Sequence, residues 1–251
     1  QDKSVTYIYD IFSKKLTEVA PFTVDLLLPS GAENLNYVLY TDESPYKMQR
    51  EWLDRLPFDI YSVNVHTGAK RLIGRSYRTA PKWSVNGKWA VMYDPIAQVW
   101  NKFDGATGKV VNISDAIGYP MFMESYDKPA PAPAYGIAGW TADGNNVFLY
   151  DAYDWWKIDL TGERQPECLT KGYGRKHGKS IRKMTSNIDK DVFQKDEKVI
   201  VSLWDKDTMD EGVYQLDMKG RLRKLMEGNY VYTIHRFSDN HEYCVWNRQN
   251  V

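Results

Sequence analysis

Apolar residues along this chain occur in short runs, and the runs end at turn-forming Gly, Asn or Asp residues. The longest runs, such as residues 199–204, have the length of a β-strand. Helical periodicity is scarce, and its one candidate covers residues 46–55, before Pro57. The pattern therefore predicts an all-β chain in which residues 46–55 are an insertion.

One motif recurs along the chain: an aromatic residue, a small polar residue, a tight turn and then an apolar run. Asn-Gly and Asp-Gly occupy the turn in two of the copies, and these dipeptides tolerate the positive φ of hairpin turns. Each copy therefore predicts a strand, a turn and a second strand. The copies are residues 83–94, residues 140–151, residues 237–246 and, more weakly, residues 193–204.

A second element follows each copy, an aromatic-rich strand closed by a glycine turn. The turn glycines lie 40, 54 and 58 residues apart (108−68, 162−108, 220−162). A short fourth strand follows, as in residues 70–73. The glycines are Gly68, Gly108, Gly162 and Gly220.

Units of four short strands, repeated at about 40 to 50 residues, are typical of β-propeller blades. Because each blade packs between two others, its inner strands should be continuous apolar runs, as residues 147–150 are. We therefore expect a single β-propeller domain or arc of four-stranded antiparallel blades, a fragment of a larger propeller. The number of blades stays open, as does whether the end pieces pair to close a ring. The blade pieces are residues 4–20, 34–75, 81–115, 135–170, 187–227 and 230–251.

Composition and charge exclude several classes of protein. The 33 basic residues balance the 33 acidic ones, which argues against a nucleic-acid-binding protein or one held to an anionic membrane. No apolar run approaches the roughly 18 residues of a membrane span. Cys168 and Cys244 form no CxxC pair and are expected to be separate reduced thiols. Both ends of the chain look cut, so we expect a piece of a longer protein whose targeting signal lies outside it.

Two stretches carry a resemblance to known families. Residues 81–87 resemble the TolB-type propeller repeat, with Val85 and Asn86 where Pro and Asp are usual. A longer match, about residues 120–185, resembles the propeller of large bacterial proteins in the prolyl oligopeptidase family of serine peptidases. The match is carried by three stretches, residues 134–143, residues 150–159 and residues 169–176.

The second resemblance implies a function. In that family the propeller precedes an α/β-hydrolase domain, caps it and filters the peptides that reach its active site. The Gly-x-Ser-x-Gly motif of the hydrolase nucleophile is absent, and the nearest approach, residues 74–78, lacks the second Gly. We therefore expect that the catalytic domain is missing from this chain, that the chain itself is not an enzyme, and that its parent is a secreted or periplasmic serine peptidase.

The candidate substrate-facing residues lie in and near the same stretch. Tyr153, Asp154, Trp155 and Trp156 place three aromatic rings beside an acid, and such rings suit stacking on peptide side chains or sugars. The alternative is packing between blades. In the dipeptidyl-peptidase branch a Glu pair holds the substrate's amino terminus; Glu124 is the acid in a comparable place, but Ser125 follows it.

Arg175 belongs to a basic stretch, residues 171–183, which contains six Lys or Arg residues and no acid. This stretch would dock an anionic ligand or an acidic partner face, or else it is a flexible connection between blades. Residues 128–134, in which Pro alternates, predict an extended segment over a propeller face or on the surface.

No cofactor or metal is expected. The four histidines form no metal-binding motif. The acidic turn at residues 205–212 could hold calcium through its carboxylates, but its spacing departs from that of an EF-hand, and the alternative is a solvated turn between strands. A propeller lyase with a central metal is a distant third possibility. The main alternative to a peptidase propeller is a stand-alone TolB-like propeller that binds a protein or a glycan. The oligomeric state stays open.

Overall fold

The computed structural model describes residues 5–21, 26–30, 36–53, 55–184, 191–238 and 243–250. The chain forms two compact units, which are described separately. The first unit contains Gln1–Asp115 and Lys128–Ala132, and the second contains Ala116–Asp127 and Pro133–Val251.

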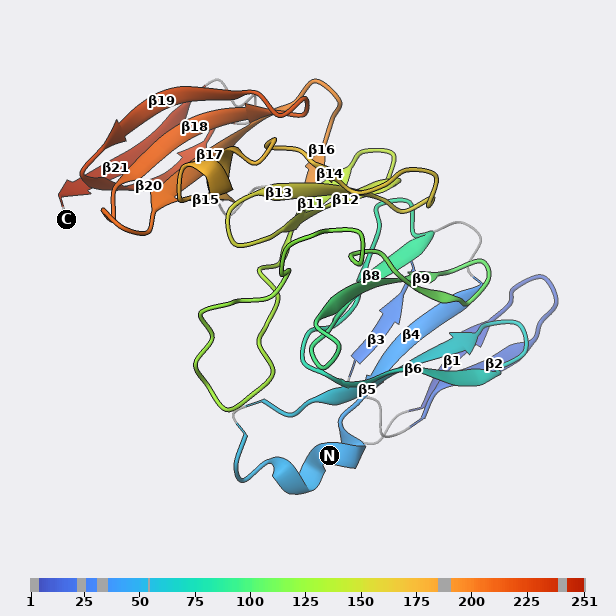
Figure 1. Cartoon of the computed structure of the whole chain (residues 1–251). Coiled ribbons are helices and arrows are strands. Elements are labelled where there is room, and N and C mark those ends of the chain that lie inside the picture. Colours follow the sequence, from blue (N-terminus) through green and yellow to red (C-terminus); the bar gives the residue numbers. More distant parts are fainter. Residues whose placement is uncertain are drawn as a thin grey trace. The chain divides into compact units, whose positions relative to one another are not determined.

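The first unit contains three antiparallel sheets whose strands follow one another in chain order (Figure 1). A short 3-10 helix, η1 (Ser44–Gln49), lies in the region where the sequence predicted a helical insertion. The two-stranded sheet is β1 (Thr6–Tyr9) and β2 (Leu16–Ala20). The first four-stranded sheet is β3 (Leu26–Pro29), β4 (Tyr37–Asp42), β5 (Phe58–Asn64) and β6 (Lys70–Tyr77). The second is β7 (Lys82–Trp83), β8 (Trp89–Asp94), β9 (Val99–Asp104) and β10 (Val110–Asn112).

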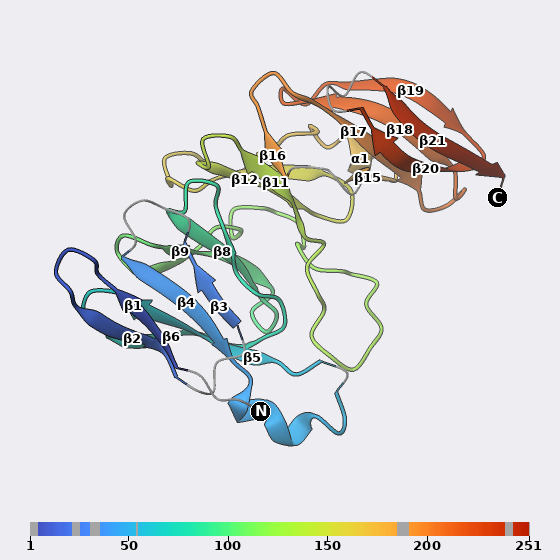
Figure 2. The same cartoon turned by 180° about the vertical axis from the view of Figure 1, so that it is seen from behind.

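The second unit also has three sheets, and one short helix, α1 (Tyr173–Lys176), stands before its second sheet. The first sheet is β11 (Ile137–Thr141), β12 (Asn146–Tyr150), β13 (Trp155–Asp159) and β14 (Glu167–Cys168), with β16 (Val192–Phe193) parallel to β11. The next is β15 (Lys179–Lys183), β17 (Lys198–Asp205), β18 (Glu211–Asp217) and β19 (Leu222–Gly228). The last is β20 (Tyr230–Phe237) and β21 (Cys244–Asn250), beside β18 and β19 (Figure 2).

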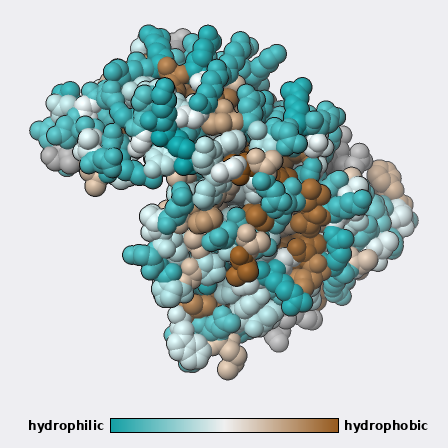
Figure 3. Space-filling view, viewed as in Figure 1, coloured by the Kyte–Doolittle hydropathy of each residue, from teal (hydrophilic) through white to brown (hydrophobic). Residues whose placement is uncertain are grey.

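These sheets confirm the predicted fold class, an all-β chain of four-stranded antiparallel blades of the β-propeller type. The middle strands are buried on both faces, as the continuous apolar runs predicted: Val147, Phe148 and Leu149 of β12 are each at most 1% exposed. The outer strand β19 is largely exposed, and Figure 3 shows a mostly hydrophilic face over β17–β19. No described helix is long and apolar enough to cross a membrane.

The repeated motif forms the same hydrogen-bonded turn in both units. A hydroxyl oxygen before the turn accepts the backbone N–H of the residue that opens the next strand. The distances are 3.1 Å for Trp89 N to Ser84 Oγ, 3.0 Å for Asn146 N to Thr141 Oγ1 and 3.0 Å for Tyr243 N to Ser238 Oγ. Residues 239–242 of the third copy lie outside the described residues.

The predicted turn glycines are needed for their backbone conformation. Gly68, Gly108, Gly162 and Gly220 all have a positive φ, between 69° and 84°. A side chain at Gly220 would also collide with the Leu169 carbonyl. This position therefore requires glycine for two reasons, its positive φ and the lack of space for a Cβ.

One blade begins earlier than the sequence predicted. The fifth piece was expected at residues 187–227, but β15, from the basic stretch, pairs with β17 and forms one edge of that sheet. Only Ile181 of β15 is apolar, between Ser180 and Arg182, so no apolar run reveals this strand. The weak copy of the motif, residues 193–204, is therefore shared between two sheets. Its Phe193 lies in β16, which joins the sheet of β11, and packs on Phe148 and Trp155.

The basic stretch is therefore structured. Tyr173–Lys176 and Lys179–Lys183 form α1 and β15, which corrects the alternative of a flexible connection over residues 171–183. Whether the two units belong to one propeller domain stays a prediction.

Candidate functional site

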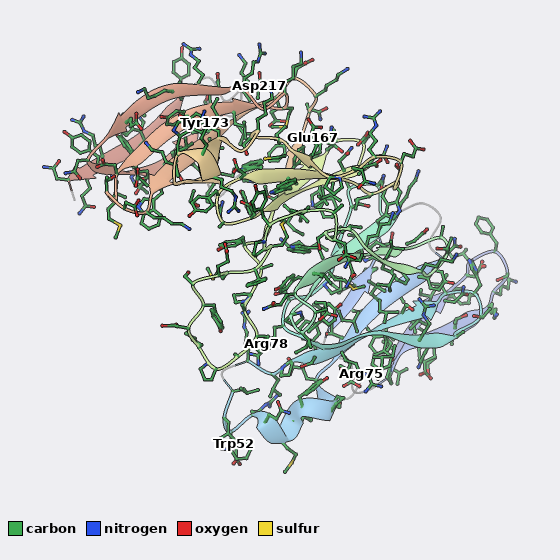
Figure 4. The ribbon with its side chains drawn as sticks, viewed as in Figure 1. Trp52, Arg75, Arg78, Glu167, Tyr173 and Asp217 are labelled. Atoms are coloured by element: carbon green, nitrogen blue, oxygen red, sulfur yellow. The ribbon has the colours of Figure 1, made fainter. Side chains whose placement is uncertain are left out.

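A cavity of about 370 Å³ lies in the second unit, where the β12–β13 turn meets the β14–β15 connection. Figure 4 labels Glu167 and Tyr173, the sequence neighbours of Cys168 and Gly172 in the cavity wall. The wall contains Tyr119, Asp151, Asp154, Trp156, Cys168, Gly172, Arg175 and Lys176. The basic stretch and the aromatic-acidic turn that the sequence singled out therefore meet at one place.

Asp151 organises the β12–β13 turn. Its Oδ1 accepts the backbone N–H groups of Tyr153 (2.7 Å) and Asp154 (2.6 Å), as an Asp at the start of a tight turn does. Its Oδ2 accepts Trp156 Nε1 (3.1 Å) and Arg175 Nη2 (3.0 Å). The residue is fully buried. This carboxylate therefore holds the turn with one oxygen and Arg175 with the other.

Asp154 anchors α1 to the same turn. Its carboxylate accepts the Thr170 hydroxyl (2.6 Å) and the backbone N–H groups of Gly174 (2.9 Å) and Arg175 (3.0 Å). Only glycine fits at position 174, because a Cβ would lie 2.6 Å from the Tyr153 carbonyl oxygen. Asp154 is 2% exposed, and the three hydrogen bonds that it accepts use most of the accepting capacity of its carboxylate.

Arg175 presents the main cation of the cavity. Its Cζ lies 3.8 Å from the ring centroid of Tyr119 and 4.9 Å from that of Tyr153. Burial acts to lower the pKa of Arg175, but the hydrogen bond to Asp151, the charge of Asp151 and the field of Glu124 together raise it. The guanidinium is thus held between a buried carboxylate and two phenol rings.

Glu124 lies in the field of Arg175 but is exposed to solvent. Its backbone N–H donates to the Tyr135 hydroxyl at 3.2 Å. The structure therefore brings Glu124, Tyr153, Asp154 and Arg175 into one neighbourhood.

Trp155 does not belong to this site. It is fully buried among Phe148, Tyr150 and Phe193, and its Nε1 donates to the Ile181 carbonyl at 3.2 Å. The expectation that Trp155 faces a substrate is corrected, because successive strand residues point to opposite faces. Its neighbour Trp156 lines the cavity instead.

The sequence missed Tyr119, and it grouped Trp156 with Trp155 without distinguishing which of the two faces the cavity. Tyr119 lies 56 residues before Arg175 (175−119) in a connection without a motif. No local pattern points to it, whereas strand alternation at the Trp155–Trp156 pair could have indicated that only one ring enters the core.

Arg182, another cation of the basic stretch, is committed to the backbone. Its Nη2 donates to the carbonyls of Asp151 (2.7 Å) and Ala152 (3.2 Å), and its Cζ lies 4.7 Å from the Tyr150 ring centroid. Burial lowers the pKa of Arg182 and raises that of Tyr150 to about 12. Arg182 therefore stabilises the β12–β13 turn through hydrogen bonds to its backbone carbonyls.

Burial raises the pKa of the Cys168 thiol, which disfavours a thiolate nucleophile. Among the residues that the structure describes, no group of three His, Cys, Asp or Glu side chains could hold a metal ion.

The first unit has a larger cavity of about 600 Å³ at the turns of its β7–β10 sheet. Its wall includes the aromatic residues Tyr37, Trp83 and Trp89, together with Asn36 and Asp104. Trp83 Nε1 is fixed by the Leu28 carbonyl at 3.0 Å.

The sheets define a chain of the β-propeller class, and the solved structures to which it is similar include TolB-type propellers and acylaminoacyl peptidase. No protein-family model matches the sequence. No curated protein matches it either.

The structural similarities are distant. TolB from Acinetobacter baumannii is 13% identical, with a TM-score of 0.39 over 90% of this chain and 49% of that one. A TolB from Agrobacterium tumefaciens, described as putative, is 14% identical, with a TM-score of 0.40 over 91% of this chain and 76% of that one. An acylaminoacyl peptidase from Pyrococcus horikoshii is 11% identical, with a TM-score of 0.40 over 97% of this chain and 38% of that one. The chain thus spans about half of the first structure and less of the last.

Proposed function

We propose that this chain is a non-catalytic β-propeller region of a serine peptidase similar to the prolyl oligopeptidases. In this role it binds peptide segments, governs which peptides reach an α/β-hydrolase domain of the same protein, and supports that domain. The protein would act in the periplasm or outside the cell.

The observation that carries this proposal is the cavity at α1. The residues that resemble the peptidase propellers, in particular Tyr153, Asp154 and Arg175, gather there with Tyr119 and Trp156. Two phenol rings, an indole and a guanidinium offer a peptide both stacking surfaces and hydrogen-bond donors. The buried carboxylates hold this arrangement in place, as a binding site with a fixed shape requires.

The proposal is tested on the full protein from its source. An antibody raised against this chain captures that protein, which is then treated with a fluorophosphonate probe and separated by size. We expect a labelled band much larger than 29.2 kDa. The isolated chain should hydrolyse no peptide. A captured protein without label, or one near the size of this chain, would contradict the peptidase assignment.

A second candidate function is a stand-alone propeller that binds a protein or a glycan. The cavity of the first unit favours it, because Trp83, Trp89 and Tyr37 next to amide and carboxylate groups suit stacking on a sugar ring. This candidate predicts an unlabelled captured protein and saturable binding of an oligosaccharide, lost on Trp89→Ala. Trp52→Ala is the matched control, because this exposed tryptophan lies outside that cavity wall.

A further inference from the structure

Several N–H donors of the Arg175 guanidinium have no acceptor among the residues that the structure describes. Among the residues that the structure describes, its side chain hydrogen-bonds a single acceptor, Asp151 Oδ2, through Nη2. Its Nε is buried with no acceptor in that part of the chain. A guanidinium carries five N–H donors, and this side chain is 28% exposed. Nε is too buried for a ligand to reach, so the donors available to a molecule that enters the cavity are the N–H groups on the Nη atoms that Asp151 does not use.

Aromatic contacts direct those donors. The Tyr119 ring lies against the guanidinium at 3.8 Å, and the Tyr153 ring lies within 4.9 Å. Rings that stack on a guanidinium cover its face and leave its N–H edge free for an acceptor in the plane. A carboxylate matches that edge in both geometry and charge.

The cavity wall contains two acids, Asp151 and Asp154, and two cations, Arg175 and Lys176, so its formal charges balance. Asp151 and Asp154 lie in the wall, but their oxygens already accept hydrogen bonds from seven donors in total. Lys176 also lies in the wall, is exposed, and has no ionic partner among the described residues. Lys206 adds a further cation, with its Nζ 4.2 Å from the Tyr153 ring centroid. An anion in the cavity therefore meets Lys176 and Lys206, which have no ion pair among the described residues, while Arg175 is already paired with Asp151 and offers its remaining N–H donors.

We propose that this cavity binds a carboxylate group of a peptide through Arg175, with Lys176 as the second cation. The carboxylate belongs either to the C-terminus of the peptide or to an Asp or Glu side chain, since the same chemistry recognises both. This inference rests on the proposed function, because it names the chemical feature by which the chain would select peptides.

Four short peptides test it by isothermal titration calorimetry with this chain. They are acetyl-Ala-Ala-Ala with a free C-terminus, the same peptide as its amide, acetyl-Ala-Glu-Ala-amide and acetyl-Ala-Gln-Ala-amide. Because a charge-assisted hydrogen bond is at stake, at least one carboxylate peptide should bind about ten- to a hundredfold more tightly than its neutral partner. Which pair differs identifies the source of the carboxylate.

Variants assign the preference to the cavity. Arg175→Gln should abolish it, and Arg175→Lys should restore it only in part, because Lys lacks the planar pair of donors. Arg164→Gln is the matched control, since Arg164 is an exposed arginine of the same blade outside the cavity wall. If Arg175→Gln does not fold, the exposed Lys176→Gln replaces it and should weaken carboxylate binding several-fold.

The outcomes separate this inference from the proposed function. Equal affinity for charged and neutral peptides, or a preference that persists in the variants, overturns the inference and leaves peptide binding standing. If none of the four peptides binds the folded chain, the inference is also overturned. The fluorophosphonate experiment then decides the proposed function by itself.

Discussion

Two hairpin turns of the second unit start from the same local structure and end in different environments. At β12–β13, Asp151 Oδ1 accepts the N–H groups two and three residues ahead, and at β17–β18 Asp205 Oδ1 does the same with Asp207 (3.0 Å) and Thr208 (3.2 Å). Asp151 is fully buried and also binds Arg175 and Trp156. Asp205 remains near solvent.

The difference lies in what the rest of the chain brings to the second oxygen. Arg175 of α1 forms an ion pair with the second oxygen of Asp151. Asp205 lies in the field of Lys179, but Lys179 pairs with Glu227 at 2.6 Å. The two turns thus differ in whether a distant segment supplies a cation to the second oxygen of the turn-forming carboxylate.

The largest effect should come from Asp151→Ala. This change leaves Arg175 and Trp156 Nε1 without their shared acceptor and removes two hydrogen bonds from the turn. We expect a loss of about 3 kcal/mol in the free energy of unfolding, at the low end for a broken buried pair because Arg175 is partly exposed. Urea unfolding followed by tryptophan fluorescence measures it. A loss no larger than that of Asp205→Ala would break the comparison.

Arg175→Gln should cost less, about 1 to 2 kcal/mol, because Asp151 keeps its other three donors. A double-mutant cycle with Asp151→Ala should show that the two losses are not additive, since the residues form one ion pair. Additive losses in the same urea experiment would mean that the pair is not coupled.

The pH dependence of the stability lost on Glu227→Gln should show how much the ion pair between Lys179 and Glu227 contributes to folding. Hydrogen bonds from Lys179 and Lys224 lower the pKa of Glu227 to about 2, whereas an unfolded Glu has a pKa of about 4.3. A depressed pKa in the folded state adds stability above pH 4.3 that is lost as the pH falls through about 2. The gain is below about 1 kcal/mol, because water screens this partly exposed cluster.

The measurement compares wild type and Glu227→Gln in urea at several pH values. Their difference should be full at pH 6 and should disappear near pH 2. A difference that does not change with pH would show that the Lys179 ion pair contributes nothing to folding.

The smallest effect should come from Asp205→Ala. The N–H groups of Thr208 and Asp207 lower the pKa of Asp205, so its contribution is present above the unfolded pKa of about 3.9 and is lost in acid. We expect a slight shift of the urea midpoint at neutral pH and none in strong acid. A shift as large as that of Asp151→Ala would show that burial does not distinguish the two turns.

Much of the fold follows from residues that are close in sequence. The runs at residues 89–94 and 146–150 form the buried strands β8 and β12, and the turn glycines have the positive φ that hairpins demand. The prediction was wrong about the start of one blade, because β15 contains a single buried apolar residue and is identified as a strand only by its pairing with β17.

The site could be predicted in part. Tyr153, Asp154 and Arg175 were identified and do meet, but Trp155 was assigned to the wrong face and Tyr119 was not found. Strand alternation distinguishes the two neighbouring tryptophans only once the core face is known. A contact between residues 56 positions apart leaves no trace in local sequence.

By itself the sequence determined the turns and most of the strands, β15 excepted, because each of these depends on neighbours within a few residues. Tertiary structure alone decided that Asp151 meets an arginine 24 residues away, while Lys179, in whose field Asp205 lies, pairs with Glu227 instead. The physical reason is that local hydrogen bonds fix the backbone of a turn, whereas the burial and charge balance of its carboxylate depend on which distant segments pack against it.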